Sequence, residues 1–314
     1  MIRPLWVLVG PTAVGKTRLA LRIAREAGAE IISADSRQVY RGMDIGTAKP
    51  DPVQRGLVPH HLIDVVDPDG PFDAGIFRKM ALEAIEAIHR RGKIPLVAGG
   101  TGLYVRVLTE GLCEAPKADP GLRVSLLRRE TEEGEGTLYA ELVRVDPDSA
   151  RRIHPRDQVR IVRALEVFTQ AGIPLSRLQR EGTGERLPFR IGVVGLTLDR
   201  EVLYRRIEAR VDAMVAQGLE GEVRGLLERG YDKDLPSMMG LGYKQWVGFL
   251  RGQYGREEAI RLLKRDTRRY AKRQGTWFRR DPGIHWVSAD PDGESTADRV
   301  LRTFRSLTTE GSQR

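Results

Sequence analysis

The feature that most constrains this chain is its N-terminal segment, where five apolar residues run directly into a glycine-rich loop. Residues 5–9 predict a buried strand, and a helix is expected over 18–27. The loop between them has the form Gly-x-x-x-x-Gly-Lys-Thr. Such a loop turns backbone N–H groups toward an anion, and the following helix adds the positive end of its dipole. The segment therefore predicts an α/β fold that binds a di- or triphosphate.

Two side chains of this loop have expected roles in holding phosphate. Lys16 supplies a mobile positive charge, and Thr17 offers a hydroxyl to a magnesium ion that shares the phosphate oxygens. The alternative is an ordinary glycine-rich turn between a strand and a helix, but here the motif and its context agree. The residues expected to bind the phosphates are Gly10, Pro11, Thr12, Ala13, Val14, Gly15, Lys16 and Thr17.

Composition narrows the class of protein. The chain has 314 residues, long enough for one large domain or for a domain that carries an insertion. A single cysteine, Cys113, excludes a disulfide framework, and no apolar run reaches the roughly 20 residues that span a bilayer. Because the N-terminus leaves no room for a signal peptide, we expect a cytoplasmic protein. The net charge of +9 suits a polyanionic partner, although a solvated basic surface would give the same value.

Two further strands are expected to end beside the phosphate loop. Residues 30–34 lead into Asp35, and residues 94–98 lead into a second glycine-rich turn that contains Thr101. In open α/β sheets the ligand crevice lies at the carboxyl ends of the strands. Asp35 could bind magnesium, act as a general base or form only an Asx turn. The second glycine-rich turn is by itself a weak signal.

The whole pattern predicts a P-loop NTPase-like α/β core with a central parallel sheet and an inserted helical domain. We assign residues 1–115 and 189–314 to the core and 116–188 to the insertion, which shows almost no strand pattern. Helices are expected in it over 122–133, 137–145, 148–153 and 157–171. We expect Arg156, Arg160 and Arg163 on one helix face, where they could bind a polyanion or simply be solvated.

The remaining core segments add three expectations. A strand over 60–67 would place His60 and His61 on opposite faces, which argues against a shared metal ion. Arg206 and Arg210 lie one turn apart on a helix over 200–217 and could reach the phosphates. Residues 261–280 carry nine basic residues, with Trp277 and Phe278 among them. They suit a nucleic-acid backbone with a base to stack, or equally a plain basic helix with core aromatics.

Taken in order, these motifs resemble the tRNA dimethylallyltransferase (tRNA isopentenyltransferase) family of bacterial type, across nearly the whole chain. The phosphate loop is common to many families, but the ordered set is not. Some eukaryotic relatives carry a C-terminal zinc finger, for which this chain has neither the cysteines nor the length. The resemblance is carried by residues 10–17, 35–40, 43–50, 59–64, 97–104, 163–166, 242–244 and 272–278.

The resemblance implies transfer of a dimethylallyl group from dimethylallyl diphosphate to a tRNA. The acceptor would be N6 of the adenosine on the 3′ side of the anticodon, in tRNAs that read codons beginning with U, and diphosphate would be released. The phosphate loop would then hold a prenyl diphosphate rather than ATP, with Mg²⁺ neutralising charge. Asp35 would accept the proton of the amine, and the target base would have to leave its stack.

The resemblance also implies roles for further residues. Arg206 and Arg210 would assist diphosphate binding, and the helical insertion would clamp the tRNA anticodon stem-loop. A monomer is expected. The catalytic residues are expected to be Asp35, Thr12, Lys16 and Thr101. The residues expected to contact tRNA are Asp35, Ser36, Arg37, Gln38, Thr101, Arg123, Gln158, Val159, Arg160, Ile161 and Val162.

Two other functions compete with this interpretation. An ATP-dependent small-metabolite kinase would bind ATP tightly and ignore tRNA. A non-catalytic RNA-binding protein with a vestigial phosphate loop would bind tRNA even with Asp35 replaced. The intact Lys16, Thr17 and Asp35 argue against the second of these.

Overall fold

The computed structural model describes residues 3–182, 187–290 and 294–309, and the chain divides into two compact units. The first unit, the catalytic core, consists of Met1–Thr109 together with Leu187–Arg314. The second, the helical unit, is Glu110–Arg186. The sequence pattern placed these changes slightly later, after residues 115 and 188.

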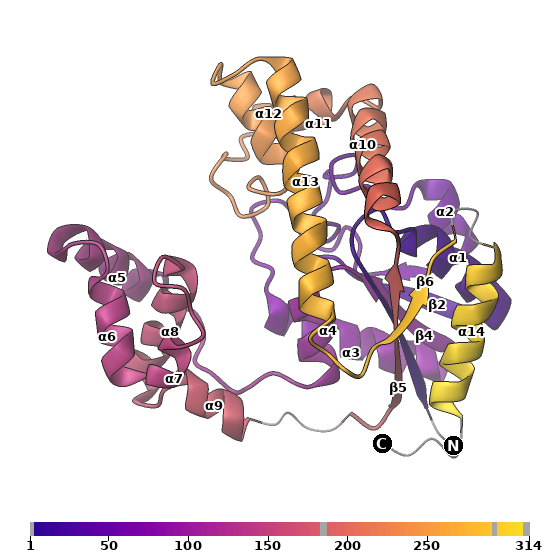
Figure 1. The fold of residues 1–314 in the computed structure, drawn as a ribbon, viewed down its shortest axis with the longest axis horizontal. Helices are drawn as coiled ribbons and strands as arrows, with labels where there is room; N and C mark the ends of the chain where they lie inside the picture. The colour runs from indigo at the N-terminus through magenta and orange to yellow at the C-terminus, as the bar shows by residue number, and fades with distance from the viewer. Residues whose placement is uncertain (1–2, 183–186, 291–293, 310–314) are drawn as a thin grey trace. The chain divides into compact units, whose positions relative to one another are not determined.

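A six-stranded parallel sheet forms the centre of the catalytic core, as predicted (Figure 1). Its strand order is β3-β2-β4-β1-β5-β6. The strand expected over 60–67 is much shorter, because only two residues of it pair with β2. The strands are β1 (Pro4–Val9), β2 (Ala29–Ala34), β3 (His60–His61), β4 (Ile94–Gly99), β5 (Arg190–Thr197) and β6 (His285–Ser288).

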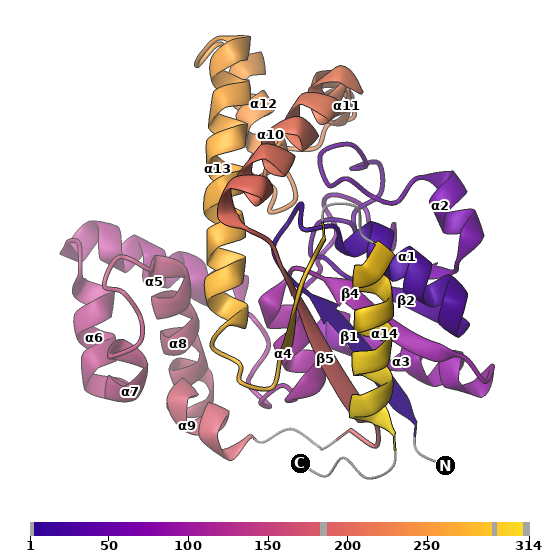
Figure 2. The same ribbon diagram turned by 45° about the vertical axis from the view of Figure 1, so that its right-hand side comes forward.

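Helices cover both faces of this sheet (Figures 1 and 2). Trp6 and Leu8 of β1 join the cluster formed with α1 (Lys16–Ala27) and α14 (Glu294–Thr308), and Trp6 stacks on Phe304 with ring centroids 5.0 Å apart. The alternate residues of β1 pack with α3 (Ala74–Arg90) and α4 (Gly102–Thr109). Burial on both faces explains the uninterrupted apolar run of β1. Helices α4 and α14 were not predicted, because their apolar residues are recognisable as a buried face only once they pack on the sheet.

Four helices stand beyond the carboxyl ends of the strands (Figure 2). They pack with residues 39–43 into a third apolar cluster. The short helix α2 (Pro52–Leu57) begins with a capping box of Asp51 and Gln54. Within the described ranges, no helix is both long and apolar enough to cross a membrane. The four helices are α10 (Arg200–Ala216), α11 (Leu219–Glu228), α12 (Tyr243–Leu250) and α13 (Arg256–Phe278).

The helical unit has its own apolar core, built from residues such as Leu126, Leu142 and Leu165. Arg156 precedes α8, so the predicted face shared by Arg156, Arg160 and Arg163 does not form. Arg163 instead donates to the carboxylate of Glu166 over 2.6 Å. The helices are α5 (Pro120–Glu133), α6 (Thr137–Val145), α7 (Pro147–Ala150), α8 (Gln158–Ala171) and α9 (Leu175–Glu181), the last of which was not predicted.

Glu166 is a fully buried carboxylate that ties this unit together. It accepts two hydrogen bonds from Arg123, over 2.9 and 3.0 Å, in addition to the one from Arg163. The backbone N–H of Asp119 donates to it over 2.7 Å. Burial alone would raise the pKa of Glu166, but the hydrogen bonds from the two arginines hold it below its ordinary value. The carboxylate is therefore ionised and links α5 to α8.

We predict that Glu166→Gln destabilises the helical unit by about 2–3 kcal/mol, because the amide cannot accept all of these charge-assisted bonds. Since the folded pKa lies below the unfolded one, the stabilisation is present above the unfolded pKa and is lost as pH falls through the folded one. Hydrogen exchange of α5 and α8 amides at pH 7 and below pH 4 measures both effects. Glu132→Gln, which breaks the exposed pair with Arg128, should change stability by less than about 0.5 kcal/mol.

Candidate active site

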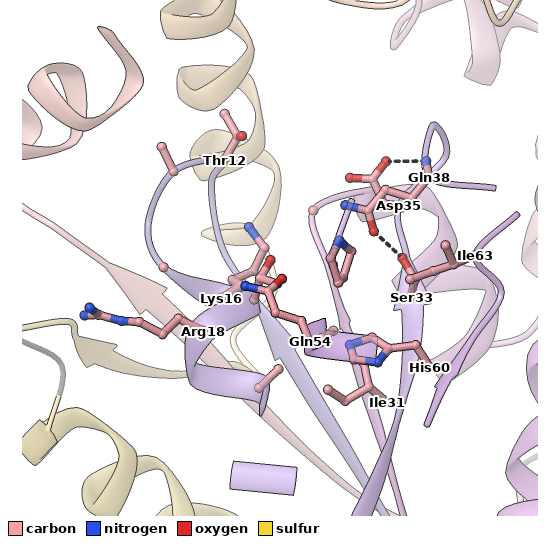
Figure 3. Close-up of a pocket in the computed structure, with 18 of the residues that line it drawn as sticks. Thr12, Lys16, Arg18, Ile31, Ser33, Asp35, Gln38, Gln54, His60 and Ile63 are labelled. Carbon is pink, nitrogen blue, oxygen red and sulfur yellow. Dashed lines mark hydrogen bonds between the residues drawn. The ribbon is translucent and has the colours of Figure 1, made fainter. Parts of the chain in front are cut away.

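The register of the parallel sheet brings three chain segments together at one edge. Val9 and Ala34, the last residues of β1 and β2, both pair with Gly99 at the end of β4. The residues that follow each strand therefore leave the sheet side by side. A cavity of about 380 Å³ lies at this edge, lined by the phosphate loop, the segment after β2, and residues of α10 and α13 (Figure 3). The predicted crevice is thus present where the strands end.

The phosphate loop has the backbone conformation that an anion cradle requires. Gly10 has φ +144°, and a Cβ there would lie 2.8 Å from the carbonyl oxygen of Leu196, so no side chain fits. Helix α1 begins at Lys16 and has no acidic residue in its first turn, so the positive end of its dipole is not neutralised locally. The loop residues that line the cavity are Thr12, Ala13, Gly15, Lys16 and Thr17, whereas Gly10, Pro11 and Val14 shape the loop behind them.

Lys16 lies in this loop with its ammonium group over the backbone. Its Nζ donates to the carbonyl oxygens of Gly10 and Pro11, each over 2.8 Å. Burial and the charge of Arg210 together lower the pKa of Lys16 to about 7, although the carboxylate of Asp35 opposes both. An anionic ligand would raise this pKa again. The site is therefore poised to gain charge when a phosphate enters.

Arg206 and Arg210, one turn apart on α10, line the same cavity. A guanidinium N–H of Arg206 donates to the carbonyl oxygen of Val14 over 3.4 Å, which places this side chain against the phosphate loop. Burial lowers the pKa of Arg210, and the nearby carboxylate of Asp35 partly offsets this. Lys16, Arg206 and Arg210 thus line one cavity together with Asp35, whose charge acts on Lys16 and Arg210.

Asp35 is the first residue after β2, and it forms the Asx turn that the sequence left as one alternative (Figure 3). Its Oδ1 accepts from the backbone N–H of Arg37 over 2.8 Å and from that of Gln38 over 3.4 Å. The same side chain also lines the cavity. The turn orients the carboxylate, and this does not exclude a chemical role for it.

The other residues predicted near Asp35 are held by specific contacts. Gln38 accepts from the hydroxyl of Ser33 over 3.0 Å and donates to the carbonyl oxygens of Thr47 and Ala48 (Figure 3). Thr101 lies behind Asp35, where its Oγ1 accepts from the backbone N–H of Ser36 over 3.0 Å. These bonds join the segment after β2 to the glycine-rich turn after β4.

A second cavity, of about 290 Å³, adjoins the first within the catalytic core. Four residues line both cavities: Thr12, Asp35, Arg210 and Tyr270. The second cavity is lined by apolar residues such as Met214 and Leu263 and also by basic ones. The basic residues are Arg37, Arg210, Lys244 and Arg273. Ser36 lines it as well. Asp35 thus stands where a ligand on the phosphate loop could meet a ligand in the second cavity.

Helix α13 supplies two site residues that the sequence analysis did not select, Tyr270 and Gln274. The side chain of Gln274 accepts from the backbone N–H of Thr12 over 2.9 Å and donates to the carbonyl oxygen of Gly100 over 2.8 Å. A Cβ on Gly100 would lie 2.3 Å from Gln274 Nε2, so this glycine admits the contact. The resemblance covered residues 272–278, but no sequence pattern shows which backbone groups a glutamine reaches.

The site suits a magnesium ion that arrives with a phosphate better than a preformed metal centre. The described part of the chain holds no cluster of three or more His, Cys, Asp or Glu that could bind a metal. Thr17 is exposed at the start of α1 and lines the cavity, so its hydroxyl could share an ion with phosphate oxygens. His60 and His61 bond to different groups, the carbonyl oxygen of Val58 and the carboxylate of Glu30.

The residues predicted to contact tRNA from the helical unit divide into two groups. Gln158, Val159 and Arg160 are exposed at the start of α8, where Val159 has 82% of its surface accessible. Ile161 and Val162 are buried, so their side chains serve the core of the unit. Arg123 bonds to the carboxylate of Glu166 and keeps 42% of its side chain exposed. Contact of this stretch with RNA stays a prediction.

We predict that diphosphate binding takes up a proton through Lys16. Because the pKa of Lys16 is about 7 in the free protein and a bound anion raises it, affinity should fall above pH 7, by up to about tenfold per unit. Calorimetry with inorganic diphosphate at pH 8, in buffers of different ionisation enthalpy, measures the uptake. Lys16→Met should lose this uptake, and equal uptake by the variant would contradict the prediction.

We also predict that Gln274→Leu weakens inorganic diphosphate binding by about tenfold, because the N–H of Thr12 loses its acceptor and the loop loses its link to Gly100. Calorimetry at pH 7 measures the affinity, and thermal unfolding checks that the variant is folded. The matched control is Gln253→Leu, an exposed glutamine outside both cavities, which should bind like the unaltered protein. Unchanged affinity in Gln274→Leu would show that the link is dispensable.

Comparisons with known proteins point to one family. The family model described as IPP transferase matches residues 38–281. A tRNA dimethylallyltransferase of Syntrophobacter fumaroxidans is 51% identical over 304 residues, which cover 97% of this chain and 89% of that protein. A crystal structure of the tRNA isopentenylpyrophosphate transferase of Bacillus halodurans is 39% identical, with a TM-score of 0.71 and coverage of 97% and 98%.

A eukaryotic dimethylallyltransferase acting on tRNA is 28% identical, with a TM-score of 0.82, and the match covers 99% of this chain and 82% of that one. The fold is therefore shared with structures from both bacterial and eukaryotic sources. The family model spans most of the catalytic core and all of the helical unit. From its motifs, its fold and these matches, the chain belongs to the IPP transferase family.

Proposed function

We propose that this protein transfers a dimethylallyl group from dimethylallyl diphosphate to N6 of the adenosine on the 3′ side of the anticodon in tRNA. The observation that carries the proposal is the position of Asp35, in the wall shared by a phosphate-binding cavity and a second cavity. The names of the similar proteins support a tRNA prenyltransferase. No observation favours the alternative of a small-metabolite kinase.

The donor occupies the cavity at the phosphate loop. Backbone N–H groups at the start of α1 bind the diphosphate oxygens, and the charges of Lys16, Arg206 and Arg210 stabilise the anion that forms as the C–O bond breaks. Thr12 lies at the boundary of the two cavities and is held by Gln274. We propose Thr17 as the protein ligand of Mg²⁺, which would neutralise charge on the diphosphate.

The acceptor adenine enters the second cavity after it has left the anticodon stack. Its N6 attacks the allylic carbon, the electron pair of the C–O bond leaves with diphosphate, and Asp35 accepts the N6 proton. The amine is a weak nucleophile, so placing it beside the allylic carbon contributes more than its basicity. The Asx turn of Asp35 and the bond between Thr101 and the N–H of Ser36 hold this wall in place.

The RNA itself binds along basic and exposed surfaces of each unit. Arg37, Lys244 and Arg273 line the second cavity and would contact phosphates near the extruded base. In the helical unit, Gln158, Val159 and Arg160 offer exposed side chains for the anticodon stem-loop. We propose that the protein acts as a monomer in the cytoplasm, on tRNAs that read codons beginning with U.

Asp35→Asn separates the chemical role of this residue from its role in the turn. The asparagine oxygen still accepts from the N–H groups of Arg37 and Gln38, but the amide cannot take up a proton. We expect at least a hundredfold loss of transfer, in the range of general-base contributions, with tRNA affinity retained. The measurement is the mass of unmodified tRNA after incubation with magnesium and dimethylallyl diphosphate.

Asp44→Asn is the matched control, since this aspartate pairs with Lys49 and lines neither cavity. It should transfer at close to the unaltered rate. ATP replaces the prenyl donor in a parallel reaction. Full activity of Asp35→Asn would show that Asp35 is not the general base. If the unaltered protein adds no prenyl group but consumes ATP with a small metabolite, the proposed function is wrong.

A further inference from the structure

Tyr270 has a position that the reaction described so far does not use. Among the residues that line either cavity in the described part of the chain, it is the only Phe, Tyr or Trp, and it lines both cavities. It lies on α13 one turn before Gln274, whose two hydrogen bonds fasten this helix to the phosphate loop and to the turn at Gly100. The ring is therefore set at the boundary where donor and acceptor meet.

The side chain of Tyr270 also lies beside that of Thr101, whose Oγ1 accepts from the backbone N–H of Ser36. Burial, together with the charge of Asp35, raises the pKa of Tyr270 to about 12. The phenol consequently stays neutral at physiological pH. A neutral phenol is a poor nucleophile, so the ring can lie beside an electrophilic carbon without being alkylated.

The ionised groups at this boundary do not stabilise the positive charge that develops on the prenyl donor. As the C–O bond of the prenyl donor lengthens, negative charge grows on diphosphate and positive charge on the allylic carbon. Lys16, Arg206 and Arg210 stabilise the negative charge on diphosphate but repel the positive charge on the allylic carbon. The carboxylate of Asp35 must remain available for the N6 proton. A π face attracts positive charge without forming a bond to it, and the attraction strengthens where water is excluded.

We propose that Tyr270 is a catalytic residue whose aromatic ring stabilises the positive charge developing on the allylic carbon at the boundary of the two cavities. The inference rests on the proposed function. In the step, the C–O bond breaks with its electron pair on diphosphate, the N6–C bond forms, and the N6 proton passes to Asp35. Tyr270 forms and breaks no covalent bond, and its contribution is greatest in the transition state.

The test varies the electron density of the ring while its size stays nearly constant. Phenylalanine and its 4-fluoro, 3,5-difluoro and 3,4,5-trifluoro analogues are placed at residue 270 by suppression of a stop codon. Single-turnover rates are measured with tRNA, magnesium and dimethylallyl diphosphate. We expect Tyr270→Phe to stay within about threefold of the unaltered protein, and the rate to fall stepwise with fluorination, by about tenfold or more over the series.

Diphosphate affinity and thermal stability should not change with the transfer rate across the series. The affinity for inorganic diphosphate and the thermal unfolding temperature should be the same across the series, because each ring fills the same space. Tyr270→Leu, which lacks the ring, should lose about 30-fold or more in rate. The matched control is the same series at Tyr254, whose hydroxyl donates to the carbonyl oxygen of Gln245 outside both cavities, and it should be flat.

The outcomes separate this inference from the function on which it rests. Equal rates across the fluorinated series, in a protein that transfers the prenyl group, would overturn the role of the ring. Loss of transfer already at Tyr270→Phe would assign the contribution to the hydroxyl and likewise overturn it. Absence of transfer by the unaltered protein would instead overturn the proposed function, and the role of Tyr270 with it.

Discussion

The site depends on the register of a parallel sheet. Because Val9 and Ala34 are both level with Gly99, the phosphate loop, Asp35 and the second glycine-rich turn leave the sheet as neighbours. Gln274 then fastens two of these segments to α13, and Thr101 fastens the third to the same turn. A shift of one residue between β1 and β4 would displace the phosphate loop from the carboxylate and would exchange the two buried faces of β1, so that each side chain would meet the wrong helix layer.

Electrostatics in the catalytic core are organised around an anion that the protein does not itself supply. Lys16, Arg206 and Arg210 line one cavity with Asp35, and burial lowers the pKa of both Lys16 and Arg210. Holding cations together in this way costs stability in the free protein, and an anionic ligand offsets the cost. The helical unit shows the opposite arrangement, since Arg123 and Arg163 there share the buried carboxylate of Glu166. Arginines that the sequence does not distinguish thus line a ligand cavity in the catalytic core and stabilise the fold of the helical unit.

Several parts of the site were predictable because local chemistry alone determines them. The apolar run before Gly10, the glycine spacing and the helix after Lys16 form a self-contained anion site, and the structure has each part. Arg206 and Arg210 were placed by helical periodicity. Helices α4 and α14 were missed because their packing against the sheet decides them. The strand expected over 60–67 shortened to two residues for the same reason, since pairing with β2 ends there.

The sequence by itself determined the phosphate loop, the parallel α/β architecture and the helical character of the insertion, because each rests on spacing along the chain, and its ordered motifs indicated the family by resemblance. Only the tertiary structure decided which distant residues meet. Gln274 reaches Thr12 across 262 positions, and Tyr270 lines both cavities from a helix near the other end of the chain. It also decided that Ile161 is buried while Val159 is exposed. A side chain's partners depend on how helices pack, and no local pattern encodes that.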